Sequence, residues 1–170
     1  MKVIDNFYSK KSFNKIVDMF ESRATGWTLS HGITKLEDLS LSLDYYMFVH
    51  PIYSDLCPQS GWFDELINDI QPPLHELLGV NLSLISRIKC NLYPRTEVIN
   101  KHPWHFDSDK LKLRAALLMI NTCDGYTGFE DGSKVESVAN RLVLFDATKL
   151  HHSTSTTNAS YRMTLNINYV

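Results

Sequence analysis

The spacing of apolar residues divides the chain into a mainly helical first half and a strand-rich second half. Four apolar residues recur at helical spacing near the N-terminus, namely Phe13, Ile16, Val17 and Phe20. They predict a helix with one apolar face that begins at Ser12, as its N-cap, and runs to about Ser22. Gly26 follows the pattern and is the expected stop signal.

A second helical pattern lies further along the chain, at Phe63, Leu66, Ile67 and Ile70. Pro72 and Pro73 are expected to end this helix, because proline lacks the amide hydrogen that a helix interior needs. A further short helix is predicted at residues 74–78, before Gly79. Residues 27–60 show neither period, which predicts a long irregular connection that could fold over a site.

From about Leu82 the apolar period changes to two. Strands are predicted at residues 87–93, 115–120, 141–145 and 161–169, with Asp-Gly turn signals at residues 124–125 and 131–132. Many short strands joined by such turns are typical of an antiparallel sandwich or jelly roll. We therefore expect an α+β fold that is mainly β, with the N-terminal helices covering one sheet.

The last predicted strand has one polar and one apolar face. Its polar positions are Arg162, Thr164, Asn166 and Asn168, and its apolar positions are Met163, Leu165, Ile167 and Tyr169. The polar face of a terminal strand can be solvated, or it can line a cavity inside the barrel. The pattern alone leaves both interpretations open.

Length and charge narrow the class of protein. The 170 residues suffice for a single domain, which we expect to combine helical support and loops over residues 1–80 with a jelly-roll core over residues 81–170. The formal net charge of -2 lacks the basic excess of a general nucleic-acid binder. It favours a peptide, protein or small-molecule substrate, and the oligomeric state stays open.

Neither a membrane span nor a secretory signal is predicted. No stretch approaches the roughly 18 consecutive apolar residues that a span requires, and no long apolar run follows the first lysine. Cys57, Cys90 and Cys123 are an odd number of cysteines without CxxC spacing. This disfavours a disulfide framework or a zinc ribbon and predicts a cytoplasmic protein with reduced cysteines.

A candidate metal site begins at His105 and Asp107, two residues apart. In extended backbone both side chains point to the same side, so they can bind one ion. A second imidazole is available from the neighbouring His151 and His152. Two imidazoles and one carboxylate form the facial triad of non-haem iron oxygenases, which leaves positions for a bidentate 2-oxoacid and dioxygen.

A candidate anion site follows on the last predicted strand, where Arg162 and Thr164 share one face. A guanidinium offers a planar fork to a carboxylate, and the threonine hydroxyl adds a donor. The pair could hold the distal carboxylate of a 2-oxoacid. The alternative is an edge-strand arginine paired with a surface acid.

Five segments carry a resemblance to a known family. They are RIKCNLYPRT, HPWHFD, INTCDGYTGFEDG, NRLVLFDATKLHHSTSTT and YRMTLNINY, which span about half of the chain. In this order they resemble the prolyl-4-hydroxylase-like 2-oxoglutarate/Fe(II)-dependent dioxygenases, especially small phage and bacterial members. The resemblance implies a double-stranded β-helix that hydroxylates an unactivated C–H bond, with a prolyl residue of a peptide or protein as first candidate. It implies Fe(II), 2-oxoglutarate as cosubstrate and O2, with ascorbate as a candidate reductant.

The resemblance also implies roles for single residues. His105 and Asp107 would be metal ligands, Arg162 would bind the C5 carboxylate of 2-oxoglutarate, Thr164 would lie beside it, and Tyr93 would hydrogen-bond that carboxylate.

The third ligand would come from one of two adjacent histidines. His151 follows Phe145 by the spacing expected from the family and begins HHSTSTT, which is similar to the family's HxGT pattern. His152 has the family's spacing to Arg162. Neighbours in extended backbone point to opposite faces, so only one reaches the metal, and we expect His151.

Two rival functions remain. A zinc hydrolase can use the same two histidines and one carboxylate, but it needs a general base and has no use for Arg162. A non-catalytic jelly-roll binding module would keep the scaffold and have no need of the triad.

Overall fold

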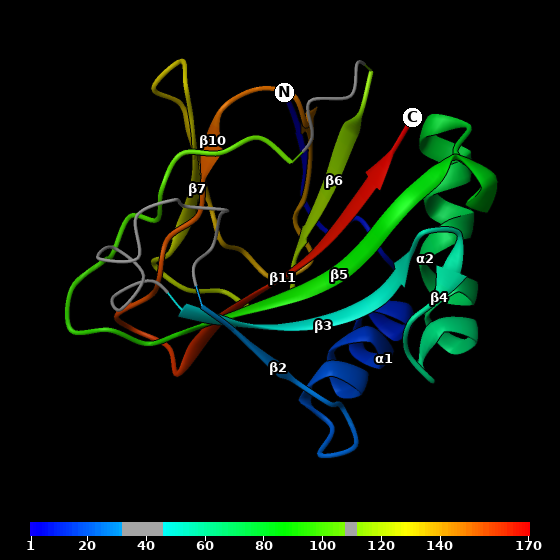
Figure 1. The fold of residues 1–170 in the computed structure, drawn as a ribbon, viewed down its shortest axis with the longest axis horizontal. Helices are drawn as coiled ribbons and strands as arrows, with labels where there is room; N and C mark the ends of the chain where they lie inside the picture. The colour runs from blue at the N-terminus through cyan, green and yellow to red at the C-terminus, as the bar shows by residue number, and fades with distance from the viewer. Residues whose placement is uncertain (32–45, 108–111) are drawn as a thin grey trace.

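The computed structural model describes residues 1–31, 46–107 and 112–170, which form two antiparallel sheets and two α-helices (Figure 1). The helices are α1 (Lys10–Glu21) and α2 (Phe63–Leu78), and a 3-10 helix (Leu82–Leu84) follows α2. The large sheet has the order β1 (Lys2–Ile4), β9 (Leu142–Asp146), β6 (Arg114–Met119), β11 (Tyr161–Tyr169), β5 (Ile85–Pro94), β3 (Tyr46–Ser54) and β2 (Thr28–His31), with β4 (Cys57–Pro58) paired to β3. The small sheet has the order β10 (His151–His152), β7 (Tyr126–Phe129) and β8 (Lys134–Glu136).

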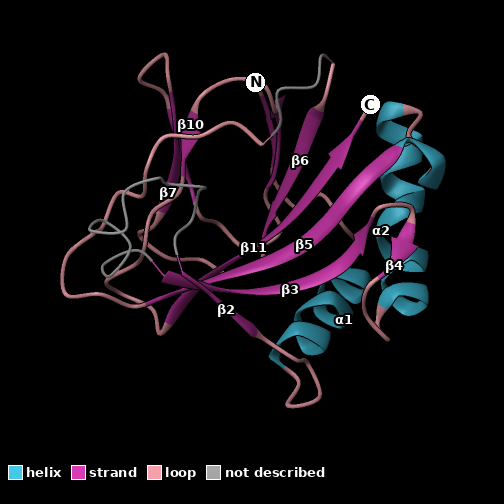
Figure 2. Ribbon diagram, viewed as in Figure 1, coloured by secondary structure: helices cyan, strands magenta, loops and turns pink. Residues whose placement is uncertain are grey.

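The large sheet separates two apolar cores. The helices lie on one side of it and the small sheet on the other (Figures 1 and 2). Apolar residues of α1 and α2 pack against one face of the large sheet. On the opposite face, residues of β6 and β9 pack against Phe129 and Val135 of the small sheet. Two facing antiparallel sheets with helices on the outside form the predicted jelly roll.

The two faces of β11 enter different environments. Met163, Leu165 and Ile167 are buried in the core beneath the helices. Arg162, Thr164, Asn166 and Asn168 point the other way, and each is at most 5% exposed. These side chains are buried, and Arg162, Thr164 and Asn166 border one cavity with Thr127 and His151 of the small sheet. The polar face of β11 therefore lines the interior of the jelly roll, and the solvated alternative is excluded.

The N-cap of helix α1 lies three residues before the expected one. Ser9 is the N-cap, and its side-chain oxygen accepts a hydrogen bond from the Ser12 amide at 3.1 Å. The prediction of Ser12 was wrong because a capping hydroxyl acts from outside the first turn, on an amide inside it. The helix ends at Glu21, where the extended backbone of Ser22 turns the chain, so Gly26 is not its stop.

Helix α2 continues through Pro72 and Pro73 to Leu78, so the predicted break was also wrong. Each proline removes one helical hydrogen bond and disfavours the helix by about 3 kcal/mol. Three leucine and isoleucine side chains on one helix face are at most 1% exposed, namely Leu66, Ile70 and Leu74. Burying such side chains stabilises by about 1.5–3 kcal/mol each, and the two halves bury them on one continuous face. Gly79, with φ 69°, ends the helix as predicted.

The predicted irregular connection at residues 27–60 contains strands β2, β3 and β4 in its described part. Strand β3 pairs with β5 along the large sheet, and its register shifts between Pro51 and Tyr53. This irregularity breaks the period of two, which is why the strand was missed. Residues 32–45 of this connection lie outside the described residues, so the expectation that it folds over a site stays a prediction. Within the described part of the chain, no helix has both the length and the apolarity to cross a membrane.

Candidate active site

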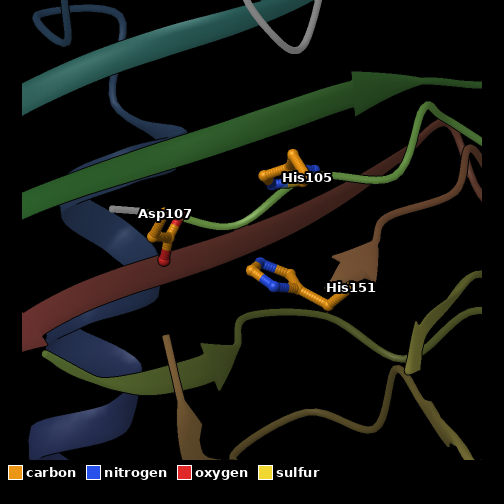
Figure 3. A group of neighbouring side chains, drawn as sticks. All are labelled: His105, Asp107 and His151. Carbon is orange, nitrogen blue, oxygen red and sulfur yellow. The ribbon is translucent and has the colours of Figure 1, made fainter. Parts of the chain in front are cut away.

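Three side chains of types that could hold a metal ion converge between the two sheets: His105, Asp107 and His151 (Figure 3). Their ligand atoms all lie within 4.8 Å of one another. The backbones of His105 and His151 exchange two hydrogen bonds, of 2.9 and 2.8 Å. The Asp107 amide donates to the carbonyl oxygen of Ala147 at 2.9 Å. Backbone pairing across 46 positions of sequence, between His105 and His151, and across 40 positions, between Asp107 and Ala147, therefore holds the cluster together.

Both clustered imidazoles have one nitrogen oriented by a backbone carbonyl. His105 Nδ1 lies 3.2 Å from Pro103 O, and His151 Nδ1 lies 2.9 Å from Lys149 O. A carbonyl only accepts, so each Nδ1 carries the hydrogen and each Nε2 keeps its lone pair for a metal. Burial, followed by the charge of His151, lowers the pKa of His105 to about 4. The His105 ring is therefore neutral at pH 7, as a metal ligand must be.

The Asp107 carboxylate is held by three donors. Asn168 Nδ2 and Asn166 Nδ2 donate to Oδ2 at 2.8 and 3.1 Å, and Arg87 Nη2 donates to Oδ1 at 3.3 Å. Burial alone would raise the pKa of Asp107, but His151, Arg87 and the two asparagine hydrogen bonds lower it to about 2. The carboxylate is thus ionised and fixed in orientation.

Arg87 and Asn168 were not assigned roles from the sequence. Asn168 Oδ1 accepts from Arg87 Nε and Nη2 at 3.0 and 2.7 Å, so the two side chains form one unit. The period-of-two pattern had placed both on the polar faces of their strands. What it could not provide was the pairing of Arg87 with Asn168 across β5 and β11, which brings them to Asp107.

His152 lies on the opposite side of β10 from His151. The centre of its ring lies 4.5 Å from the ring centre of Trp104 and 5.7 Å from that of Tyr126, and both contacts are edge-to-face. A Cβ atom at Gly128 would lie 2.2 Å from His152 Nε2, so the ring fills the space over that glycine. His152 is not part of the ligand cluster.

Arg162 lies in the cavity that the ligand cluster borders. The side chain is fully buried. Nη2 donates to Thr127 Oγ1 at 2.8 Å, Nη1 donates to Thr154 O at 3.3 Å, and Nε has no hydrogen-bond partner. Within the described residues no Asp or Glu forms an ion pair with this guanidinium. The alternative of an edge-strand arginine paired with a surface acid is therefore excluded.

Tyr93 and Thr164 border the same cavity. Tyr93 pairs directly with Arg162 across β5 and β11, and its ring lies 5.5 Å from the guanidinium carbon. Burial raises the pKa of Tyr93, although Arg162 and hydrogen bonds to Ser153 and Thr164 oppose this. The three side chains for which a carboxylate-binding role was expected are therefore neighbours.

Three further polar side chains at or next to this space were missed: Lys89 and Ser153 border it, and His102 contacts Ser153 and Tyr93 from the neighbouring pocket. His102 Nδ1 contacts Ser153 Oγ at 2.7 Å, and its ring lies 5.1 Å from that of Tyr93. Lys89 lies on β5 in the strand face of Tyr93. The period of β5 pointed to Lys89, whereas only the folded chain brings His102 and Ser153 to Tyr93.

The residues present fit a divalent metal together with an anion. Two imidazoles and a carboxylate suit iron and similar first-row metals. A fully buried guanidinium without a counter-charge is unfavourable by itself, so it fits a ligand that brings a carboxylate into the cavity.

No protein-family model and no curated protein sequence matches the chain. Solved structures do match it over nearly its whole length. A prolyl-4-hydroxylase from Pseudomonas putida is similar at 16% identity, covering 99% of this chain and 91% of its own, with a TM-score of 0.63. The fold is that of the 2-oxoglutarate/Fe(II) oxygenases.

Two further structures support this assignment of the fold. The viral collagen prolyl hydroxylase of Paramecium Bursaria Chlorella virus-1 is 12% identical, covers 99% of this chain and 95% of its own, and has a TM-score of 0.61. An oxidoreductase of the 2OG-Fe(II) oxygenase family from Burkholderia pseudomallei is 11% identical, covers 98% of this chain and 83% of its own, and has a TM-score of 0.64.

Proposed function

We propose that this protein is a 2-oxoglutarate- and Fe(II)-dependent oxygenase that hydroxylates an unactivated C–H bond. The observation that carries the proposal is Arg162, which is fully buried and forms no ion pair with an acid of the described residues. It lies in the cavity bordered by His105, Asp107 and His151. A zinc hydrolase would use the three ligands but would have no reason to bury a guanidinium without an acid. A non-catalytic binding module would need neither the three clustered ligands nor the buried guanidinium.

His105 Nε2, His151 Nε2 and the Asp107 carboxylate would hold the metal. The backbone carbonyls of Pro103 and Lys149 fix the two rings, and the asparagine pair on β11 fixes the carboxylate. Ligands oriented in this way need little rearrangement on binding, which raises metal affinity.

Arg162 would pair with the C5 carboxylate of 2-oxoglutarate, and Thr164 and Tyr93 would add hydroxyl donors. The free Nε of Arg162 is a donor without a partner. When bound, iron(II) and 2-oxoglutarate together activate dioxygen and yield succinate, carbon dioxide and a hydroxylated substrate. The protein's own contribution is to hold both groups in one orientation and to exclude water from the cavity.

The substrate proposed first is a prolyl residue of a peptide or protein. Two of the similar structures are prolyl hydroxylases, and the sequence motifs resemble that group. Succinate release in the presence of proline-containing peptides, with hydroxylated product identified by mass spectrometry, tests this part separately.

The first experiment is an absorption spectrum of the protein with Fe(II) and 2-oxoglutarate in the absence of oxygen. A weak metal-to-ligand charge-transfer band is expected, because it requires the 2-oxoacid to chelate iron through both its C1 carboxylate and C2 carbonyl. Arg162→Met should require far more 2-oxoglutarate for the same band. Tight binding of zinc without any charge-transfer band would instead favour the hydrolase or the binding module.

A further inference from the structure

Lys89 brings a positive charge to the metal end of the cavity. It lies on β5 directly opposite Asn166 of β11, and Asn166 donates to the Asp107 carboxylate. Arg162 and its partner Tyr93 are four residues further along the same two strands, about 13 Å away at 3.3 Å per residue. Lys89 is therefore remote from the carboxylate that Arg162 would bind.

The ammonium of Lys89 has no partner of its own. It is half-buried and borders the cavity, and it forms no hydrogen bond or ion pair with the described residues. Burial, followed by the charge of Arg87, lowers the pKa of Lys89 to about 8. An anionic group paired with Lys89 would oppose this shift and favour the charged form.

Charge accounting leaves Lys89 uncompensated when the metal and cosubstrate are bound. In the described lining, Asp107 is the carboxylate and Lys89 and Arg162 are the cations. A divalent metal would be neutralised by Asp107 and one carboxylate of 2-oxoglutarate, and Arg162 would be neutralised by the other carboxylate. The charge of Lys89 then remains without a counter-ion in the cavity, since Asp107 already pairs with Arg87 at the rim and would hold the metal. The carboxylate of a bound substrate would pair with it.

Asn166 supplies a second unsatisfied group at the same position. Its Nδ2 must face Asp107, since a carboxylate only accepts hydrogen bonds. Its Oδ1 is then an acceptor, and this buried atom has no partner. 2-Oxoglutarate has no donor to offer it, so the cosubstrate leaves it unsatisfied.

We propose that Lys89 and Asn166 form a subsite for the C-terminal residue of a peptide or for an N-acyl amino acid. The carboxylate would pair with Lys89 Nζ, and the adjacent amide N–H would donate to Asn166 Oδ1. A neutral amide fits the charge balance, whereas the ammonium of a free amino acid would restore the excess positive charge. This inference rests on the proposed function and narrows its substrate class to compounds with a free carboxylate.

The test uses matched probes on the full-length protein with Fe(II) and 2-oxoglutarate, without oxygen. The probes are N-acetylglycine, N-acetyl-L-leucine and N-acetyl-prolyl-glycine, each as the free acid and as the amide, with N-acetylsarcosine as an acid that lacks the N–H. Binding is followed by the change in the charge-transfer band and by the thermal unfolding midpoint. At least one acid is expected to bind about tenfold or more tightly than its amide, as for other hydrogen bonds to charged groups, and N-acetylsarcosine is expected to bind more weakly than N-acetylglycine.

Three variants assign the effect to Lys89. Lys89→Met keeps the length of the side chain, removes its charge and should abolish the difference between acid and amide. Lys89→Arg should retain part of it. Lys134→Met, which removes the same charge from a side chain on β8 that is 60% exposed, should behave as the wild type.

Four outcomes would overturn the subsite. The first is equal binding of acid and amide, and the second is no binding of any acid although the charge-transfer band forms. The third is a Lys89→Met variant that still distinguishes acid from amide as fully as the wild type. The last is a loss of 2-oxoglutarate affinity of about tenfold in Lys89→Met, a free-energy change equal to that of a one-unit pKa shift. The last outcome would make the cosubstrate the partner of the ammonium. If the band itself never forms in the wild type, the proposed function fails, which distinguishes that failure from failure of the subsite alone.

Discussion

Arg87 Nη2 lies 3.3 Å from Asp107 Oδ1, and the same guanidinium donates to Asn168, which donates in turn to Asp107 Oδ2. The side chain of Arg87 is 34% exposed whereas that of Asp107 is 4% exposed, so the contact joins the rim of the cavity to a buried carboxylate. Its main consequence is orientation: both oxygens of Asp107 are held from the side of the large sheet.

Loss of the Arg87 contact should weaken metal binding. Arg87→Met is expected to lower metal affinity by about 10–100-fold, the usual effect of removing a group that orients a ligand. Metal titration followed by intrinsic fluorescence measures this. Arg95→Met, at an exposed position, is the control and should keep wild-type affinity. Unchanged affinity in Arg87→Met would show that the asparagines suffice to hold Asp107.

Removal of the buried charge at position 162 should abolish 2-oxoglutarate binding without lowering the stability of the fold. Arg162→Met is expected to be as stable as the wild type, or more stable by about 1–4 kcal/mol, because replacing buried charges by apolar groups of similar volume is often stabilising. In the same variant, 2-oxoglutarate should no longer raise the unfolding midpoint, although the metal should. Urea unfolding and thermal scans with each ligand check both halves. Strong destabilisation without ligands would mean that Arg162 has a structural role.

The two adjacent histidines should respond differently to substitution. His151→Ala is expected to lose the charge-transfer band, because it removes one of the three clustered ligands. His152→Ala is expected to keep the band with unchanged 2-oxoglutarate affinity. The opposite pattern would make His152 the ligand and would contradict the geometry of β10.

Gly128 should tolerate no side chain while His152 is present. A Cβ atom there would lie 2.2 Å from His152 Nε2, and the ring is confined by Trp104 and Tyr126. Gly128→Ala should destabilise by about 1–3 kcal/mol, as overpacking does. The double variant Gly128→Ala with His152→Ala should lose less stability than the sum of the single variants, as measured by urea unfolding. Simple additivity would show that the alanine is accommodated in another way.

The metal-free protein should lose stability in mild acid. Burial, with Arg162 next in effect, lowers the pKa of His102 to about 3, and burial with His151 lowers that of His105 to about 4. An unfolded histidine titrates near 6.5. As the pH falls below about 6.5, the unfolded chain binds protons that the folded chain does not, so the free energy of unfolding falls by up to about 1.4 kcal/mol per pH unit and histidine. This loss continues to about pH 4 for His105 and to about pH 3 for His102.

Urea unfolding at a series of pH values between 7 and 5 measures this slope, and His102→Asn should reduce it. A stability that is independent of pH over this interval would contradict the buried, neutral state of both rings.

The alternation along residues 161–169 by itself determined which side chains of β11 share a face, because the strand period is a local property of extended backbone. The spacing of His105 and Asp107, and the family motifs around them, likewise identified the candidate ligands. Local sequence also marked Gly79 as a helix end, since a left-handed backbone there favours glycine.

Tertiary structure decided what local sequence could not. It carried α2 through two prolines, because the apolar face on both sides of them is buried against one sheet. It placed the polar face of β11 inside the jelly roll rather than in solvent, since the small sheet lies over that face and borders the same cavity. It brought Arg87 and Asn168 to Asp107, and Lys89 to Asn166, through the register of β5 against β11. Register depends on pairing between segments distant in sequence, so the composition of either strand alone does not contain it.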